Sequence, residues 1–244
     1  MRVQLVDLLL IQLSNYRRSW RGMIVTGVCA PLMSVIALGL LAEQSGQTNL
    51  LYVLTGSVVL SPMFQNQNNV ANNFAFVKAV GTLDFFATLP VYRHVVIVAT
   101  VPAFFLLSIP SLLVTIVAGS LFLGVPLHVT PLAIIVMSLC VMPMVGIGAL
   151  IGILTRTPEE AGSTSLLVTI SLLFLGPVIL PPDALPGWLL SMSHISPTSY
   201  AASAIRQVGS GPVTGQLWID MGVLAGLTLL TLWFVGRKIR WQER

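Results

Sequence analysis

The chain has 244 residues, of which 55% are apolar and only 8% are charged, and its mean hydropathy is +0.91. A soluble domain carries about 25% charged residues, so this composition excludes a water-soluble globular protein. The placement of the net charge of +4 therefore matters more than its size, and we expect no nucleic-acid partner. The composition predicts an all-α polytopic membrane protein with a single transmembrane domain over residues 1–244.

Residues 1–21 are predicted to form an amphipathic helix that lies in the membrane interface. Apolar side chains recur at three- and four-residue steps, and arginines cluster at the far end of the segment. The residues that carry this prediction are Arg17, Arg18, Trp20 and Arg21. No small-residue cleavage site ends the apolar run, so we expect no cleavable signal peptide. The helix is either a plain anchor or a lever that joins a cytoplasmic partner to the first span.

Sparse charges divide the rest of the chain into six apolar segments, each close to the length of about 20 residues that a span requires. The predicted spans cover residues 22–42, 50–72, 95–122, 131–154, 163–180 and 217–236. With the N-terminus inside, all of the 12 Lys and Arg residues except Arg206 fall on the inner side. The positive-inside rule therefore predicts an inner (plasma) membrane protein with both termini in the cytoplasm.

Small residues are prominent in the fourth span. Gly146, Gly148 and Gly152 let another backbone approach the fourth span closely, either from the same chain or from a second subunit. Cys29 and Cys140 lie within apolar spans, and we expect both to be buried without a disulfide or a metal.

The loop after the second span is predicted to form a short cytoplasmic helix. Gly81 and Thr82 begin it, Asp84 suits the dipole of its first turn, and Pro90 ends it. Exposed apolar side chains on this side indicate a docking surface, and the alternative is a helix that rests on the membrane. The candidate residues are Gly81, Thr82, Leu83, Asp84, Phe85, Phe86, Leu89, Pro90 and Arg93.

Two further segments are unusual for their position. Amides near the inner end of the second span, among them Gln65, Asn66 and Asn69, either bond across helices or line an inner entry to a substrate path. Residues 181–196 contain prolines but are too apolar for a free outer loop. We expect a pair of short helices that re-enter the outer leaflet, or an interfacial anchor with Trp188 among the headgroups.

The loop and the outer segment together resemble a known family. Residues 81–84 (Gly-Thr-Leu-Asp) and 89–93 (Leu-Pro-Val-Tyr-Arg) are similar to the cytoplasmic loop of type-two ATP-binding-cassette (ABC) exporter permeases. The family pattern usually has Glu where this chain has Asp84, and Ser where it has Tyr92. Residues 185–189 and 195–206 are similar to the outer segment of the same family.

The resemblance implies a permease that pairs with a second permease copy, identical or related, and with a dimer of cytoplasmic ABC ATPases. Residues 81–90 would be the coupling helix, and the outer segment would gate the pathway. Neither Lys78 nor Lys238 lies in a phosphate-binding G-x-x-x-x-G-K-[ST] loop, so ATP and Mg are expected on the partner and this chain is not expected to be an enzyme. Lesser docking contacts would come from Arg156, Glu159 and Glu160, and the gate residues would be Pro181, Pro182, Leu185, Pro186 and Trp188.

The expected function is therefore export of an amphiphilic or hydrophobic cargo, such as a drug-like molecule, a lipid or a glycolipid, from a membrane whose lipids surround the chain. An ion-coupled carrier would need an ionisable residue in mid-membrane, and none of the six predicted span centres holds one. A structural subunit without a transport role stays open.

Overall fold

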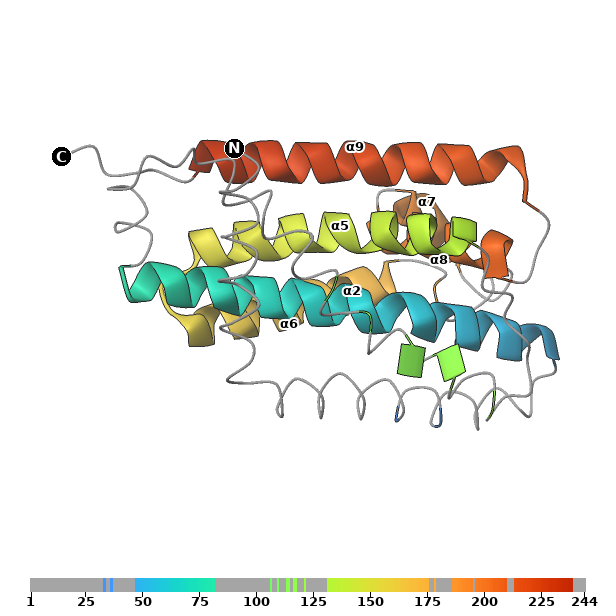
Figure 1. The fold of residues 1–244 in the computed structure, drawn as a ribbon, viewed down its shortest axis with the longest axis horizontal. Helices are drawn as coiled ribbons and strands as arrows, with labels where there is room; N and C mark the ends of the chain where they lie inside the picture. Colours follow the sequence, from blue (N-terminus) through green and yellow to red (C-terminus); the bar gives the residue numbers. More distant parts are fainter. Residues whose placement is uncertain are drawn as a thin grey trace.

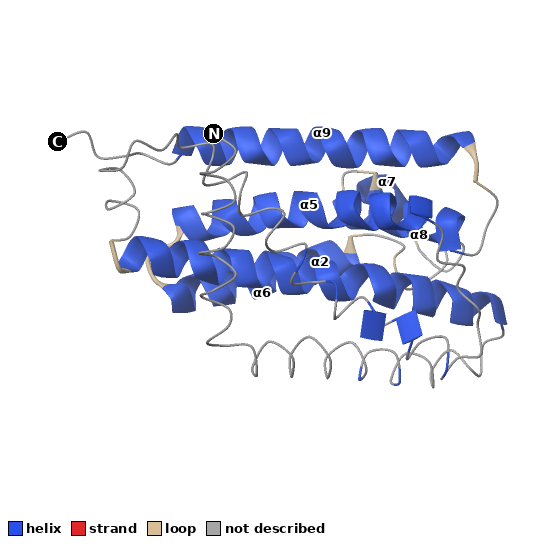
Figure 2. Ribbon diagram, in the orientation of Figure 1, coloured by secondary structure: helices blue, strands red, loops and turns tan. Residues whose placement is uncertain are grey.

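Within the part of the chain that the structure describes, every regular element is an α-helix. This computed structural model describes residues 33, 36, 47–81, 106, 109, 113, 114, 116, 117, 121, 131–175, 178, 186–194, 196–209 and 213–238. The helices are α2 (Gln47–Ala79), α5 (Pro131–Leu154), α6 (Pro158–Phe174), α7 (Gly187–Ser193), α8 (Pro197–Gly209) and α9 (Gly215–Lys238). The all-α fold class is thus confirmed, and Figure 2 shows the helices as one elongated bundle.

The long helices lie side by side along the bundle (Figure 1). α2, α5 and α9 run in the same direction, and α6 turns back because only residues 155–157 separate it from α5. One end of the bundle, which we call the Gly81 end, contains the ends of α2, α5 and α9 and the start of α6. The opposite end, which we call the α8 end, contains α7 and α8.

Glycines bring the backbones of α5 and α2 into close contact toward the Gly81 end. A Cβ atom at Gly148 would overlap the carbonyl oxygen of Gln67, and one at Gly152 would lie 2.5 Å from that of Ala71. A Cβ atom at Gly146 would overlap the side chain of Thr231 on α9. These three glycines therefore serve packing within the chain, and the alternative that they contact a second subunit is wrong for this face.

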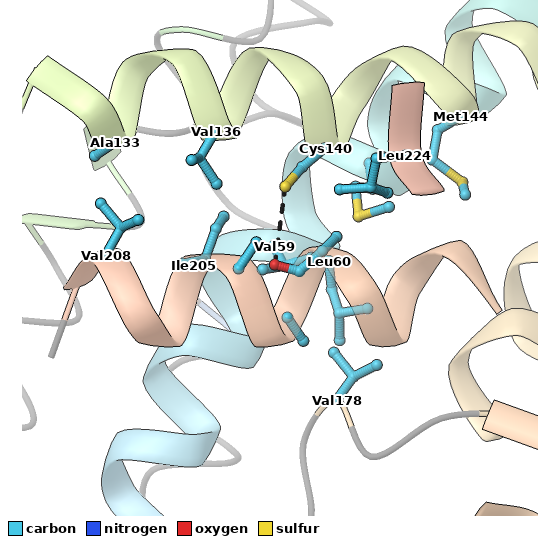
Figure 3. Close-up of a cluster of buried hydrophobic side chains, with 14 of the residues drawn as sticks. Val59, Leu60, Ala133, Val136, Cys140, Met144, Val178, Ile205, Val208 and Leu224 are labelled. Carbon is cyan, nitrogen blue, oxygen red and sulfur yellow. Dashed lines mark hydrogen bonds between the residues drawn. The ribbon is translucent and has the colours of Figure 1, made fainter. Parts of the chain in front are cut away.

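The core at the α8 end is built around α8, which packs against α2, α5 and α9. The buried face of α8 is made of small and branched residues: Pro197, Thr198, Ala201, Ala202, Ala204, Ile205 and Val208. Figure 3 shows Val208 beside Ala133 and Ile205 beside Val136, so α8 lies along the first half of α5. Because α8 is short and rich in alanine, it fits between the longer helices without displacing them.

Two of the described helices are long and apolar enough to cross a membrane, namely Leu132–Leu154 and Gly215–Arg237. They coincide with the fourth and sixth predicted spans. Their outward faces are apolar, with Leu229, Leu230 and Trp233 exposed on α9. Such faces suit contact with lipid.

Three predicted boundaries differ from the structure. α2 continues to Ala79, beyond the predicted end at residue 72, because Phe74 and Ala75 still pack against neighbouring helices. α6 begins at Pro158, whereas the fifth span was predicted to begin at residue 163. Within residues 181–196, where a pair of re-entrant helices was predicted, the described residues form α7, and α8 begins after them at Pro197.

Several predictions fall on residues outside the described part of the chain. They are the interfacial helix with Arg17, Arg18, Trp20 and Arg21, most of spans 22–42 and 95–122, the coupling residues from Thr82 to Arg93, and the gate residues Pro181, Pro182 and Leu185.

Candidate functional site: polar groups at the two ends of the bundle

The Gly81 end takes its name from the residue that terminates α2. Gly81 has a φ of 74°, a left-handed conformation that strains any residue with a Cβ. The Val80 amide donates to the Phe76 carbonyl at 3.0 Å, and the Gly81 amide donates to the Lys78 carbonyl at 3.1 Å. This glycine stop is a common way for a helix to end. The predicted coupling segment therefore begins where the chain leaves α2.

Lys78 fixes the end of α2 to the end of α5. Its Nζ donates to the carbonyl oxygens of Ile153 at 2.7 Å and of Thr155 at 3.0 Å. The last carbonyls of a helix have no partner within the helix and carry partial negative charge, so a lysine ammonium satisfies both needs. The end of α2, the end of α5 and the corner between α5 and α6 are thereby held in one arrangement.

The corner between α5 and α6 has a reciprocal N-terminal cap. The Glu160 amide donates to Thr157 Oγ1 at 3.2 Å, and the Glu160 carboxylate accepts the Arg156 amide at 2.8 Å. Pro158 occupies the first turn, where its missing N–H costs nothing. The predicted docking contacts Arg156, Glu159 and Glu160 are all exposed, and Glu160 also bonds within the chain.

The amide cluster of α2 divides between the interior and the surface. Gln67 is fully buried, and its Nε2 donates to the Ser165 carbonyl of α6 at 3.1 Å. Of the predicted pathway residues, Asn66 is buried while Gln65 and Asn69 are partly exposed. Asn72 donates back to Asn68 at 2.9 Å. The cluster covers several faces, as expected, and bonding across helices is confirmed for Gln67.

At the α8 end, Arg206 joins three segments that are distant in the sequence. Its Nε donates to Thr55 Oγ1 at 3.3 Å, and its Cζ lies 4.0 Å from the centre of the Tyr52 ring, both on α2. A second guanidinium nitrogen donates to the carbonyl of Val178, beyond the end of α6. A cation over an aromatic face with neutral acceptors at its edges suits the planar guanidinium.

The neighbouring Gln207 bonds in another direction, to α9 and the segment before it. Its Nε2 donates to Asp220 Oδ2 at 3.2 Å, and its Oε1 accepts the Thr214 hydroxyl at 2.7 Å. Asp220 is only 1% exposed and also accepts Gln216 Nε2 at 3.0 Å. The sequence analysis did not identify this buried carboxylate, because Asp220 is the fourth residue of the predicted span 217–236 and not at its centre.

The start of α8 is tied to α6 by hydroxyls. Thr198 Oγ1 donates to the Leu172 carbonyl at 3.1 Å and lies 2.6 Å from Ser196 Oγ. Pro186 precedes the first residue of α7, and Trp188 is 66% exposed, so these two predicted gate residues lie at the surface of the bundle.

These polar groups can hold helices in position through hydrogen bonds, and the helices can separate where those bonds break. The described residues contain no group of three His, Cys, Asp or Glu side chains that could hold a metal ion. Bonds of Lys78, Arg206 and Asp220 lie near helix ends, whereas the bond of Gln67 lies inside the bundle. Packed helices, two of them long and apolar enough to cross a membrane, are typical of one class of protein, the polytopic helical membrane proteins.

The comparison with known families identifies the chain more closely. The model of the ABC-2 type transporter family matches residues 3–208, so this chain belongs to that family and is a transmembrane permease subunit of the ABC type. A daunorubicin resistance ABC transporter permease protein, DrrB1, from Streptomyces coeruleorubidus is 28% identical over 152 residues. That match covers 59% of this chain and 51% of the relative, so the chain spans about half the length of the curated relative it matches.

Proposed function

We propose that this chain is the membrane subunit of an ATP-driven exporter that carries amphiphilic or hydrophobic molecules out of the cytoplasm. Membership of the ABC-2 type transporter family is the observation that carries the proposal. A drug-like cargo is supported by the relative whose name refers to daunorubicin resistance.

In this proposal the Gly81 end faces the cytoplasm. Among the described residues, Lys78, Arg156 and Arg237 all lie at that end, whereas Arg206 lies at the α8 end. Cytoplasmic loops of membrane proteins carry the excess of Lys and Arg, so this distribution favours an inward-facing Gly81 end. The proposed protein lies in the inner membrane with both chain termini in the cytoplasm, and the end of α9 at the Gly81 end supports this for the C-terminus.

The ATPase, with its ATP and Mg, is a separate pair of subunits in this proposal and docks on residues 81–90. The geometry of the Gly81 end supports it. Lys78 holds the end of α2 to the end of α5, and the Thr157–Glu160 cap fixes the start of α6 directly beyond. A force on the segment that follows Gly81 would therefore move these three helix ends together. Two permease copies complete the pathway.

Co-purification tests this proposal directly. The chain is expressed with the ATPase encoded beside its gene, purified in mild detergent, and assayed for vanadate-sensitive hydrolysis. We expect a complex of two permeases and two ATPases. Phe86→Asp should abolish co-purification, whereas Phe86→Leu, which keeps an apolar side chain, should retain it. Size-exclusion profiles of both variants check that the spans remain folded.

Two alternatives correspond to other outcomes. If the chain binds no nucleotide-hydrolysing partner but moves cargo when an ion gradient is applied, an ion-coupled carrier is the better interpretation, and Asp220 is its first candidate residue. If neither a partner nor transport is found, the chain is a structural subunit. A normal complex and normal transport with Phe86→Asp would refute docking on residues 81–90.

A further inference from the structure

The position of α8 against α2, which we call the seat of α8, depends on side chains rather than on close backbone packing. Toward the Gly81 end, α5 meets α2 through glycines, whereas α8 contributes three alanines, Ile205 and Val208 to the core at its own end. Alanine buries little apolar area, so the three alanines add little to the stability of that contact. The polar side chains that adjoin this face must therefore supply a larger share of what holds α8 in place.

Arg206 and Gln207 are adjacent but bind different neighbours. Gln207 reaches Asp220 and Thr214, which follow it closely in the chain, so α8 and α9 would stay near each other without this contact. Arg206 reaches Tyr52 and Thr55, about 150 residues away, as well as the Val178 carbonyl. Chain connectivity cannot replace these contacts.

We propose that Arg206 is a positioning residue that seats α8 against α2, and that release of this seat opens the α8 end during transport. The second clause rests on the function proposed above, and the first does not. A guanidinium is needed because it stacks on the Tyr52 ring while its edge donates to two neutral oxygens. A lysine ammonium cannot do both in this geometry.

Cys140 provides a reporter of the seat within the chain itself. Its thiol is 1% exposed and lies under α8, with Sγ 3.8 Å from the Ala201 carbonyl (Figure 3). The sequence has two cysteines, so Cys29→Ala leaves Cys140 as the one thiol of this chain. N-ethylmaleimide should label it only when α8 moves away.

The experiment compares labelling rates in the Cys29→Ala background, without any ATPase. Arg206→Gln should raise the rate about tenfold, and Arg206→Lys should raise it less. Gln207→Ala is the matched control, and it should change the rate by less than about twofold because α8 and α9 remain connected. Labelling in denaturant gives the rate for a fully accessible thiol.

Two milder variants keep the test informative if Arg206→Gln fails to fold. Tyr52→Leu keeps an apolar side chain but removes the ring, and it should raise the rate about threefold. Thr55→Val removes the hydroxyl and should act in the same direction. If the Cys140 labelling rate is unchanged in both Arg206→Gln and Tyr52→Leu, Arg206 does not hold α8 against α2. The same conclusion follows if Gln207→Ala raises the labelling rate as much as Arg206→Gln does.

The complex with the ATPase tests the release. Trapping with ATP and vanadate should raise Cys140 labelling in the otherwise unaltered chain. If the complex hydrolyses ATP before vanadate is added and trapping then leaves the labelling rate unchanged, α8 is not released and this part of the proposal fails. If no ATPase binds, the exporter function fails, but the labelling rates of the Arg206 variants still decide whether the seat exists.

Discussion

Toward the Gly81 end, α5 lies against α2 with glycines at the contact, and the backbone carbonyls of Gln67 and Ala71 fill the space that side chains would take. At the α8 end, a short inserted helix packs against α2, α5 and α9 and is bonded through Arg206, Gln207 and Thr198. Backbone packing tolerates almost no displacement, because interiors are close-packed. Side-chain bonds can break one at a time. The difference indicates a rigid half toward the Gly81 end and a half at the α8 end that can rearrange.

The largest expected effect comes from breaking the rigid half. Gly148→Ala places a Cβ on the Gln67 carbonyl, and neither backbone can move without separating α2 from α5. We expect a loss of about 3 kcal/mol of stability, or failure to fold. Thermal unfolding in one detergent measures it.

Gly222→Ala is the matched control, since a Cβ at Gly222 of α9 meets nothing within 4 Å. It should stabilise the protein by about 0.5–1 kcal/mol, because alanine favours a helix interior over glycine. Similar losses in both variants would mean that the close contact of α5 and α2 is not what holds this half together.

Lys78→Met should loosen the link between α2 and α5 at the Gly81 end. It removes the two hydrogen bonds to the Ile153 and Thr155 carbonyls. Because Lys78 is exposed, solvent screening reduces the expected loss to about 1 kcal/mol. Lys78→Arg keeps the charge and the donors and should lose less. In the ATPase complex, hydrolysis should continue in Lys78→Met while transport falls. Equal reduction of both activities would argue against transmission through this residue.

Glu160→Ala probes the capped corner between α5 and α6, with Glu159→Ala as its neighbour of identical charge. Both variants remove a carboxylate from the first turn of α6, so both lose its interaction with the helix dipole. Only Glu160 also caps Arg156. Its variant should therefore lose about 0.5 kcal/mol more than the Glu159 variant in thermal unfolding. Equal losses would show that the cap adds nothing to the rigidity of this end.

Sequence patterns predict the rigid half better than the other. The fourth span was predicted at residues 131–154 and α5 has those bounds, because an unbroken apolar run follows a proline. The start of α6 could have been predicted from Thr157, Pro158 and Glu160, which form a recognisable cap. The end of α2 could not have been predicted in this way. Its amides make the predicted span less apolar toward residue 72, but the helix continues to Ala79 because Phe74 and Ala75 pack against neighbouring helices.

The α8 end is harder to predict because its bonds join distant residues. Nothing in the sequence near Arg206 points to Tyr52 or Thr55, which lie 154 and 151 positions earlier. Arg206 itself was singled out only as an exception to the charge rule. Asp220 carried a signal, a carboxylate inside an apolar run, and its partner Gln216 lies one turn earlier on the same helix. Its other partner, Gln207, becomes evident only once α8 is folded back against α9.

The smallest expected effect tests whether the contact between α2 and α6 is dry. Ser165 is fully buried, and its Oγ makes no hydrogen bond. Burial of an unbonded hydroxyl is unfavourable, so Ser165→Ala should stabilise the protein by about 0.5 kcal/mol. Ser163→Ala is the control, because that hydroxyl is exposed and donates to the Glu159 carbonyl at 3.0 Å. The stability of the Ser163→Ala variant in thermal unfolding should be close to that of the unaltered chain.

A loss of about 1 kcal/mol in Ser165→Ala would instead indicate a water molecule bound between Ser165 and the unbonded Oε1 of Gln67. The half of the bundle toward the Gly81 end would then be less closely packed than its glycines imply.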